Sequence, residues 1–291
     1  MAQRFLTRYI DPMTVALPPS RVVLILGTNL VLLLAMMRPT LAADASSWDG
    51  GTNAAVRLIA GTPARRAGVE IRLAPGWHTY WRYPGDSGVP PRFDFSGSTN
   101  VKSVAVRWPA PRRISDEGGT SIGYKQDVVF PLDVVPQDAG KPVTLRLKVD
   151  YAVCEKICVP ADGTLELTLD RTRGAFADRI DANDATVPKA APLGGAGTLA
   201  IRAARREGGK VVVDVAAPAD APIELFAEGP TADWALPVPA PAADSPAGMR
   251  RFVFDLDGLP PNTKPDGATL KLTAVAGGTA IEVPLRLDSA N

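Results

Sequence analysis

Short stretches in which apolar and polar residues alternate recur along most of the chain. The clearest are Val69-Glu-Ile-Arg-Leu73 and Leu165-Glu-Leu-Thr-Leu169, where every second residue is apolar. A period of two is typical of a strand with one buried face. Turn signals such as Pro84-Gly-Asp86 and Asp162-Gly163 separate these stretches. The pattern therefore predicts an all-β protein built from short strands.

Two series of strands are expected, one in each half of the chain. The strands predicted in the first half are Ala54–Ala60, Val69–Leu73, Val101–Trp108, Val128–Val135, Val143–Val149 and Thr164–Leu169. Those predicted in the second half are Thr198–Ala203, Lys210–Ala216, Ile223–Ala227, Arg251–Leu256, Thr269–Val275 and Ile281–Leu287. Short strands with Pro/Gly corners favour immunoglobulin-like β-sandwiches. We expect two such domains in tandem, at residues 44–172 and 198–291.

Residues 173–197 interrupt the strand rhythm and predict a linker. Arg173–Ile180 could form one short helix, and the stretch from Val187 to Gly197 is rich in proline and glycine, as linkers are. The second half holds neither cysteine nor histidine and no catalytic motif, so its pattern predicts a fold and leaves its role open.

Residues 1–43 predict a secretory signal peptide with a long leader. Arg21 precedes an apolar stretch from Val22 to Met37, and Thr40-Leu-Ala42 followed by Ala43 forms a plausible cleavage site between Ala42 and Ala43. An uncleaved anchor is the alternative, although the apolar run is short of the ~20 residues that span a bilayer. Met13 is an alternative start. Export would place the rest of the chain in an oxidising compartment.

Charge and composition exclude some classes of function. The chain has 32 Lys and Arg residues against 31 Asp and Glu residues, which gives a formal net charge of +1. Because no basic patch stands out, nucleic acid is not an expected partner. The second half of the chain carries no nucleotide-binding motif, and no organic cofactor is expected.

The chemistry-bearing run is Tyr151-Ala-Val-Cys154-Glu-Lys-Ile-Cys158-Val-Pro160, which holds both cysteines of the chain. Residues four apart in an extended strand are separated by roughly 13 Å. A disulfide needs Cα atoms within about 4.4–6.8 Å, so the cysteines can pair only across a tight turn. A crosslink closing so small a loop removes little chain entropy. This favours disulfide exchange. The alternative is a non-enzymatic binding module in which the disulfide is a static hairpin crosslink and the second sandwich presents a partner surface.

A metal site is a further alternative. His78 is the single histidine of the chain, and Cys154, Cys158 and His78 could bind copper or zinc with a fourth ligand from elsewhere. A lone histidine among aromatic residues is more often packed than metal-bound, so we expect no metal.

An aromatic run spans residues 75–91 and includes Trp77, His78, Tyr80 and Trp81. Aromatic residues often anchor the core of a sandwich, which is the interpretation we favour for Trp77 and Trp81. They could also form a wall beside the cysteines, from which Tyr80 or His78 donates a hydrogen bond to sulfur. We favour that role for Tyr80.

A third run, from Trp108 to Tyr124, is dominated by Pro, Gly and Ser and predicts a long loop. Long loops without secondary structure tend to be functional lids, and a solvated surface loop is the alternative. Its polar candidates are Asp116, Glu117 and Tyr124.

These three runs, in this order, resemble the N-terminal periplasmic domain of the DsbD thiol:disulfide interchange family over roughly residues 45–172. The most specific pieces are Gly76-Trp-His-Thr-Tyr-Trp81, Pro84-Gly-Asp-Ser-Gly88 and Tyr151 to Pro160. The resemblance implies an immunoglobulin-like fold and a redox-active cysteine pair in the periplasm. It also implies partners: a membrane-embedded electron donor and periplasmic thioredoxin-like acceptors, such as disulfide isomerases or cytochrome c maturation factors.

The resemblance assigns roles to particular residues. Cys154 and Cys158 would be catalytic, with Cys158 as the attacking cysteine, and Val159-Pro160 would fix the backbone after it. The residues expected to shield or orient the pair are Trp77, His78, Tyr80, Asp116, Glu117, Tyr124, Tyr151 and Pro160. The chain departs from the family pattern in its closer cysteine spacing and in Gly118-Gly119, where the family's cap loop has an aromatic tip. Because no segment resembles the family's membrane and thioredoxin-like domains, we expect a stand-alone, monomeric homologue.

Overall fold

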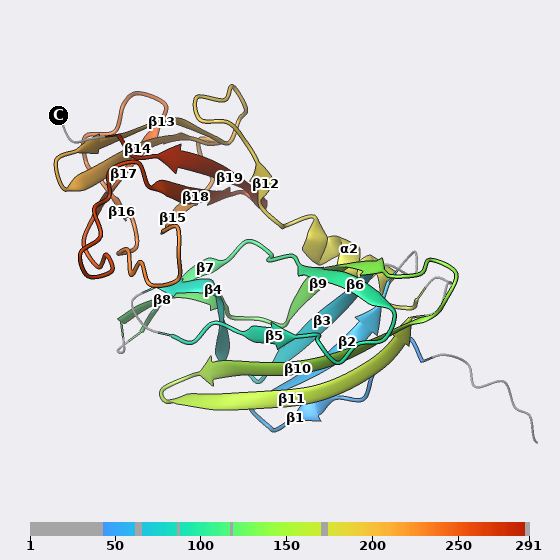
Figure 1. The fold of residues 1–291 in the computed structure, drawn as a ribbon. Coiled ribbons are helices and arrows are strands. Elements are labelled where there is room, and N and C mark those ends of the chain that lie inside the picture. Colours follow the sequence, from blue (N-terminus) through green and yellow to red (C-terminus); the bar gives the residue numbers. More distant parts are fainter. Residues whose placement is uncertain (1–42, 62–65, 86–87, 117–118, 170–173, 289–291) are drawn as a thin grey trace, which may run out of the picture. The chain divides into compact units, whose positions relative to one another are not determined.

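The computed structural model describes residues 43–61, 66–85, 88–116, 119–169 and 174–288 (Figure 1). Almost all of its regular structure is β-strand, which confirms the all-β prediction. The predicted signal peptide lies outside the described residues, apart from Ala43. Within the described ranges, no helix combines the length and the apolar character needed to cross a membrane.

The first sandwich consists of a five-stranded and a six-stranded sheet. The five-stranded sheet has the order β1 (Asp49–Gly50), β2 (Ala54–Ala60), β3 (Arg66–Leu73), β9 (Val128–Pro136) and β6 (Val101–Val106). The six-stranded sheet has the order β11 (Cys158–Leu169), β10 (Val143–Cys154), β4 (His78–Gly85), β8 (Gly119–Tyr124) and β7 (Arg112–Asp116), and β5 (Arg92–Asp94) also pairs with β10. The paired strands are antiparallel throughout.

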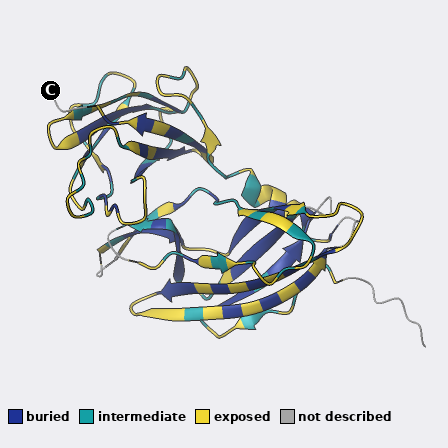
Figure 2. Ribbon diagram, viewed as in Figure 1, coloured by how far each residue is buried: buried dark blue, intermediate teal, exposed yellow. Residues whose placement is uncertain are grey.

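The core of this sandwich lies between the two sheets. Leu58 and Phe130 come from the five-stranded sheet, Leu145 and Leu147 come from the six-stranded sheet, and all four are fully buried. Along β10 and β11, buried and exposed residues alternate over most of each strand (Figure 2). The predicted period of two is therefore the period that packs this core.

Strands β10 and β11 form one long hairpin. Each is 12 residues long, and they run past the predicted ends of the two strands until they reach the cysteines. The ladder pairs Val143 with Leu169 at one end and Cys154 with Cys158 at the other. The hairpin thus carries the cysteines to its tip while its base lies in the core.

The predicted linker contains helix α2 (Ala177–Asp184), four residues further along the chain than the expected helix. Its buried Ile180 packs on Ile59 and Val129 of the five-stranded sheet. Arg179 pairs with the fully buried carboxylate of Glu70 at 2.6 Å. Arg57 of β2 pairs with the same carboxylate at 2.7 Å, so two guanidinium groups compensate its burial. The contacts of Ile180 and Arg179 attach the segment after β11 to the first sandwich.

The second sandwich consists of two four-stranded sheets. One has the order β12 (Lys189–Ala190), β19 (Thr279–Arg286), β18 (Thr269–Ala276) and β15 (Ile223–Glu228). The other has the order β13 (Ala200–Glu207), β14 (Lys210–Ala216), β17 (Arg250–Asp255) and β16 (Ala240–Pro241). Val213, Phe226, Leu272 and Val283 are among its fully buried residues.

The prediction of a long loop between Trp108 and Tyr124 is wrong. Strands β7 and β8 form a hairpin there, with Ile114 paired to Ser121 and Arg113 paired to Ile122. Both isoleucines are buried to 1% exposure. Two apolar residues in a segment rich in Gly, Ser and Thr gave too weak an alternation to predict strands.

Candidate functional site at the tip of the β10–β11 hairpin

Cys154 and Cys158 form a disulfide across the last pair of the β10–β11 ladder. Their Cα atoms lie 4.1 Å apart. Directly opposed residues in the narrow pairs of an antiparallel ladder are about 4.5 Å apart, so the hairpin itself brings the cysteines together. Residues 155–157 make the tight turn that the cysteine spacing required.

The two cysteines differ in their access to solvent. Cys154 is 7% exposed and belongs to a small cluster with Tyr80 and Ala152, separate from the main core. Cys158 is exposed. An incoming thiolate can therefore approach Cys158, while the residues packed around Cys154 shield that cysteine from solvent.

Tyr80 contacts the accessible sulfur. Its hydroxyl oxygen lies 3.2 Å from Sγ of Cys158. A disulfide sulfur carries no hydrogen, so the tyrosine donates this hydrogen bond. Tyr80 is only 2% exposed, so packing fixes the position of the donor.

His78 lies beside this pair. It is 4% exposed and is paired with Cys154 in the β4–β10 register. Its ring meets that of Tyr80 edge to face, with 5.5 Å between ring centroids. The intervening Thr79 donates a hydrogen bond of 2.9 Å to the carbonyl oxygen of Ala152, which ties β4 to β10 next to the cysteines.

Two glycines of the aromatic run allow close approaches at the site. Gly88 has φ of 144°, and a Cβ built on it would lie 2.5 Å from ring atoms of Tyr80. Gly76 has φ of 86°, and a Cβ there would lie 3.3 Å from Oε1 of Glu155 in the hairpin turn. Only glycine meets both requirements without strain.

The other residues of the aromatic and cysteine runs surround the site more loosely. Trp77 is partly buried and packs against the main core, as favoured from the sequence. Pro160 is exposed on β11, opposite Ala152. Tyr151 is buried, and its burial, together with the charges of Asp49 and Asp162, raises its pKa to about 12. Its hydroxyl therefore stays protonated at neutral pH.

The candidates from the β7–β8 hairpin lie elsewhere or are not described. Asp116 ends β7, where it is paired with Gly119, and Glu117 lies outside the described residues. Tyr124 packs its ring on Phe130 in the core and donates its hydroxyl to the carbonyl oxygen of Pro109 at 2.9 Å. Burial raises its pKa well above the ordinary value. The hydroxyl of Tyr124 thus serves the core, whereas the sequence suggested a role beside the sulfurs.

The alternative of a copper or zinc site has no cluster of ligands to support it among the described residues. Across the part of the chain that the structure describes, no three His, Cys, Asp or Glu side chains group closely enough to hold a metal ion. The thiols that would bind the metal are joined in the disulfide.

Sequence reasoning missed two features of the site: the apolar residues exposed beside Cys158, and the contact between Gly88 and Tyr80. Ile157 in the hairpin turn is 75% exposed, and Val159 next to Cys158 is 37% exposed. The apolar residue types on both sides of Cys158 were visible in the sequence, but their exposure was not. The contact between Gly88 and Tyr80 could not be read from the chain, since it depends on the path between them.

Comparisons with known proteins agree with this geometry. Residues 52–170 match the family model described as thiol:disulfide interchange protein DsbD, N-terminal, which confirms the resemblance found in the sequence. The solved N-terminal periplasmic domain of ScsB from Proteus mirabilis matches with a TM-score of 0.68 at 20% sequence identity. The match covers 86% of this chain and 100% of that one, so the shared fold extends over both sandwiches. No curated protein matches the chain.

Proposed function

Because residues 52–170 match the family of DsbD N-terminal domains, we propose that this chain relays reducing equivalents through Cys154 and Cys158. The observation that carries the proposal is the position of the disulfide. It closes the end of a hairpin, with one sulfur accessible and the other shielded. A pair in this position can open and close while the ladder behind it stays formed.

The relay consists of two thiol–disulfide exchanges. A thiolate of the reduced donor attacks Sγ of Cys158, the Cys154–Cys158 bond breaks, and Cys154 leaves as a thiolate that takes up a proton. The donor's second thiolate then attacks its own sulfur in the mixed disulfide and releases Cys158. The donor ends as a disulfide and the pair as a dithiol, a transfer of two electrons.

Delivery runs the same chemistry in the opposite sense. The thiolate of Cys158 attacks the disulfide of an acceptor and forms a mixed disulfide. Cys154 then attacks Cys158, restores the intramolecular disulfide and releases the acceptor as a dithiol. The exposure of Cys158 and the burial of Cys154 support an intermolecular bond through Cys158 and a resolving step by Cys154.

Tyr80 assists both directions. Whenever Cys158 is a thiolate, the hydroxyl 3.2 Å from its sulfur donates to a full negative charge. Hydrogen bonds to charged groups are worth about 1.5–3 kcal/mol, roughly twice as much as neutral ones. The bond therefore stabilises the reactive form of Cys158 more than it stabilises the disulfide.

The partners follow from the family and from the surface around Cys158. A membrane-embedded donor of the DsbD type would reduce the pair, and periplasmic thioredoxin-like proteins would accept its electrons. Exposed Ile157 and Val159 offer these proteins an apolar contact beside the sulfur. This role requires export, which the predicted signal peptide would provide, and a monomer suffices for it.

Redox titration tests the proposal. The purified protein is equilibrated with glutathione or dithiothreitol buffers, and the fraction of dithiol is measured by thiol alkylation. We expect a reduction potential above about −300 mV, the upper limit for structural disulfides. A lower value, with no exchange against a thioredoxin-like protein, would identify a static crosslink and overturn the proposal.

Trapping tests the assignment of the two cysteines. Cys154→Ala should accumulate mixed disulfides through Cys158, because the resolving thiol is gone. Cys158→Ala, the matched control, should accumulate far fewer, because the remaining thiol is shielded. Equal trapping by both variants would contradict the assignment.

A further inference from the structure

The pairing of strand β4 with β8 is interrupted immediately after Tyr80 of the redox site. Thr79 is paired with Tyr124 and Tyr80 with Gly123, but the next pair joins Gly85 to Ser121. Four residues of β4, Trp81 to Pro84, thus stand opposite the single residue Ile122 of β8. We call residues 81–84 the β4 bulge. Bulges redirect side chains and are frequent next to active sites.

The β4 bulge binds the second sandwich. Arg82 donates two hydrogen bonds to the carboxylate of Glu228 on β15, at 2.8 and 2.7 Å, and also pairs with Glu282 on β19. The hydroxyl of Tyr83 donates to the carbonyl oxygen of Trp234. The ring of Trp81 packs on Phe226 with 5.9 Å between centroids.

This attachment is partly desolvated and balanced in charge. The side chains of Arg82, Glu228 and Glu282 are 22%, 11% and 26% exposed. Lys271 pairs with Glu282 at 3.6 Å, so two cations face two carboxylates. Burial acts to lower the pKa of Arg82, but the bonds and charges of Glu228 and Glu282 outweigh it and raise that pKa. The bidentate geometry fixes the direction of Arg82 as well as its charge.

A second attachment holds the same part of the sheet. The backbone N–H of Arg113 on β7 donates to Glu224 of β15 at 2.8 Å, and its guanidinium donates to the carbonyl oxygen of Pro239 at 2.6 Å. Strand β7 pairs with β8, and β8 pairs with β4. The second sandwich therefore holds β4 directly and through its neighbours.

From these contacts we infer that the second sandwich positions the redox site, with Arg82 and Tyr83 as positioning residues that act through Tyr80. Tyr80 is the last residue of β4 paired before the bulge, two residues from Arg82. Gly88, just past the bulge, lies against the ring of Tyr80. The path of the bulge thus determines where the Tyr80 hydroxyl meets Cys158. This inference rests on the proposed function and gives the second sandwich a part in it.

A double-mutant cycle tests the inference. Glu228→Gln keeps the shape of the side chain and removes one of the two carboxylate charges that orient Arg82, the one bound through two hydrogen bonds. We expect it to shift the dithiol–disulfide equilibrium towards disulfide by two- to tenfold, about 10–30 mV at 29.6 mV per tenfold change. Tyr80→Phe should shift it in the same direction. In the Tyr80→Phe background, Glu228→Gln should add little, because Glu228 acts through the hydroxyl already removed.

Matched controls separate positioning from general stabilisation. Asp214→Asn breaks an ion pair of similar burial in the second sandwich, away from the β4 bulge, and should lower stability without moving the potential. Tyr83→Phe removes a different bond of the same attachment and should move the potential as Glu228→Gln does. Circular dichroism identifies any variant that fails to fold. If either Glu228→Gln or Tyr83→Phe does so, the potential of the other variant tests the inference.

The outcomes distinguish this inference from the proposed function. If the wild-type pair exchanges normally while Glu228→Gln and Tyr83→Phe leave its potential and exchange rate unchanged, the positioning role is overturned and the relay stands. Additive shifts in the Tyr80→Phe background would also overturn it. A wild-type pair that does not exchange would overturn the relay itself.

Discussion

The hydroxyl of Tyr80 and the sulfur of Cys158 are held 3.2 Å apart by different strands, β4 and β11, which do not pair with each other. Strand β10 lies between them and pairs with both. The contact therefore spans two ladders and is fixed only when all three strands are in register. A donor placed in this way can act on the sulfur without moving when the disulfide opens.

Tyr80→Phe should slow exchange and leave the fold intact. The ring stays in its packed position, and only the donor to the Cys158 thiolate is lost. A hydrogen bond to a charged group is worth about 1.5–3 kcal/mol, and partial solvation of Cys158 lowers that value, so we expect a two- to tenfold lower rate near neutral pH. The thiol pKa of Cys158 should rise. Stopped-flow exchange and a pH titration of alkylation measure both quantities, and unchanged values would contradict the role of Tyr80.

Gly88→Ala should reproduce that defect and also destabilise the protein. The new Cβ would lie 2.5 Å from the Tyr80 ring, so the ring must shift away from its present position. Overpacking and an unfavourable φ together cost about 1–3 kcal/mol. Chemical denaturation and exchange kinetics would show both effects.

Gly248→Ala is the matched control for that substitution. Gly248 has φ of 71°, but nothing lies within 4 Å of a Cβ built on it. This variant should lose stability through backbone strain and keep the wild-type exchange rate. If both glycine variants slowed exchange equally, the contact between Gly88 and Tyr80 would not be the cause.

Removing the disulfide should cost little stability. The chain-entropy treatment gives about 2 kcal/mol for a loop of five residues, against about 4.7 kcal/mol for a loop of 100 residues. The double variant Cys154→Ala/Cys158→Ala should therefore unfold cooperatively, with a free energy of unfolding lower by at most ~2 kcal/mol. Urea denaturation of oxidised, reduced and double-variant protein measures the difference. A loss well beyond that figure would favour a structural crosslink.

Much of the fold could be predicted from the sequence because it depends on local patterns. Leu165–Leu169 and Val69–Leu73 both lie within observed strands, β11 and β3. Leu165–Leu169 buries one face as its period of two predicts, whereas Val69–Leu73 also buries Glu70 on the opposite face. The tight turn between Cys154 and Cys158 followed from the reach of the chain alone. The prediction failed at the β7–β8 hairpin, where burial of Ile114 and Ile122 outweighs a composition typical of loops.

The arrangement of the site could be predicted only in part. Tyr80 was expected beside the sulfurs because of its residue type and the family resemblance, and the structure places it there. Tyr124 was expected there for the same reasons, yet the β8 register turns its ring towards Phe130. The bonds from Arg82 to Glu228 join residues far apart in the chain and leave no local trace in either segment.

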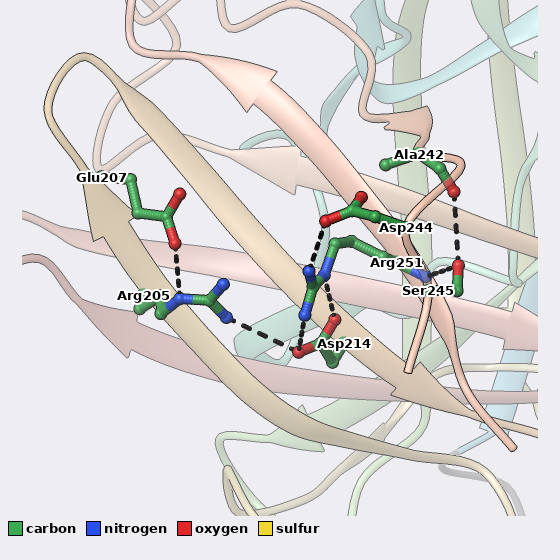
Figure 3. Close-up of polar contacts among 7 residues, drawn as sticks. All are labelled: Arg205, Glu207, Asp214, Ala242, Asp244, Ser245 and Arg251. Atoms are coloured by element: carbon green, nitrogen blue, oxygen red, sulfur yellow. Dashed lines mark hydrogen bonds and ion pairs between the residues drawn. The ribbon is translucent and has the colours of Figure 1, made fainter. Parts of the chain in front are cut away.

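The ion-pair network of the second sandwich should make stability depend on pH in the acid range (Figure 3). Arg251 on β17 pairs with Asp214 on β14 at 2.7 Å, and Asp244 pairs with the same guanidinium at 2.7 Å. The Asp214 side chain is 7% exposed. Its hydrogen bonds to Arg251 outweigh the effect of burial and lower its pKa below the ordinary 3.8.

A carboxylate whose pKa is lower in the folded state than in the unfolded state adds stability above its unfolded pKa and loses it as the pH falls through the folded value. Asp214→Asn should therefore reduce the free energy of unfolding by about 1.5–3 kcal/mol at pH 7, since it removes the charge that Arg251 binds. The gap between wild type and variant should narrow as the pH falls below about 4, the unfolded pKa, and close as it falls through the lower pKa of the folded carboxylate. Urea denaturation of both proteins from pH 7 to pH 3 measures this gap. A gap that stays constant over that range would show that Asp214 contributes through its shape alone.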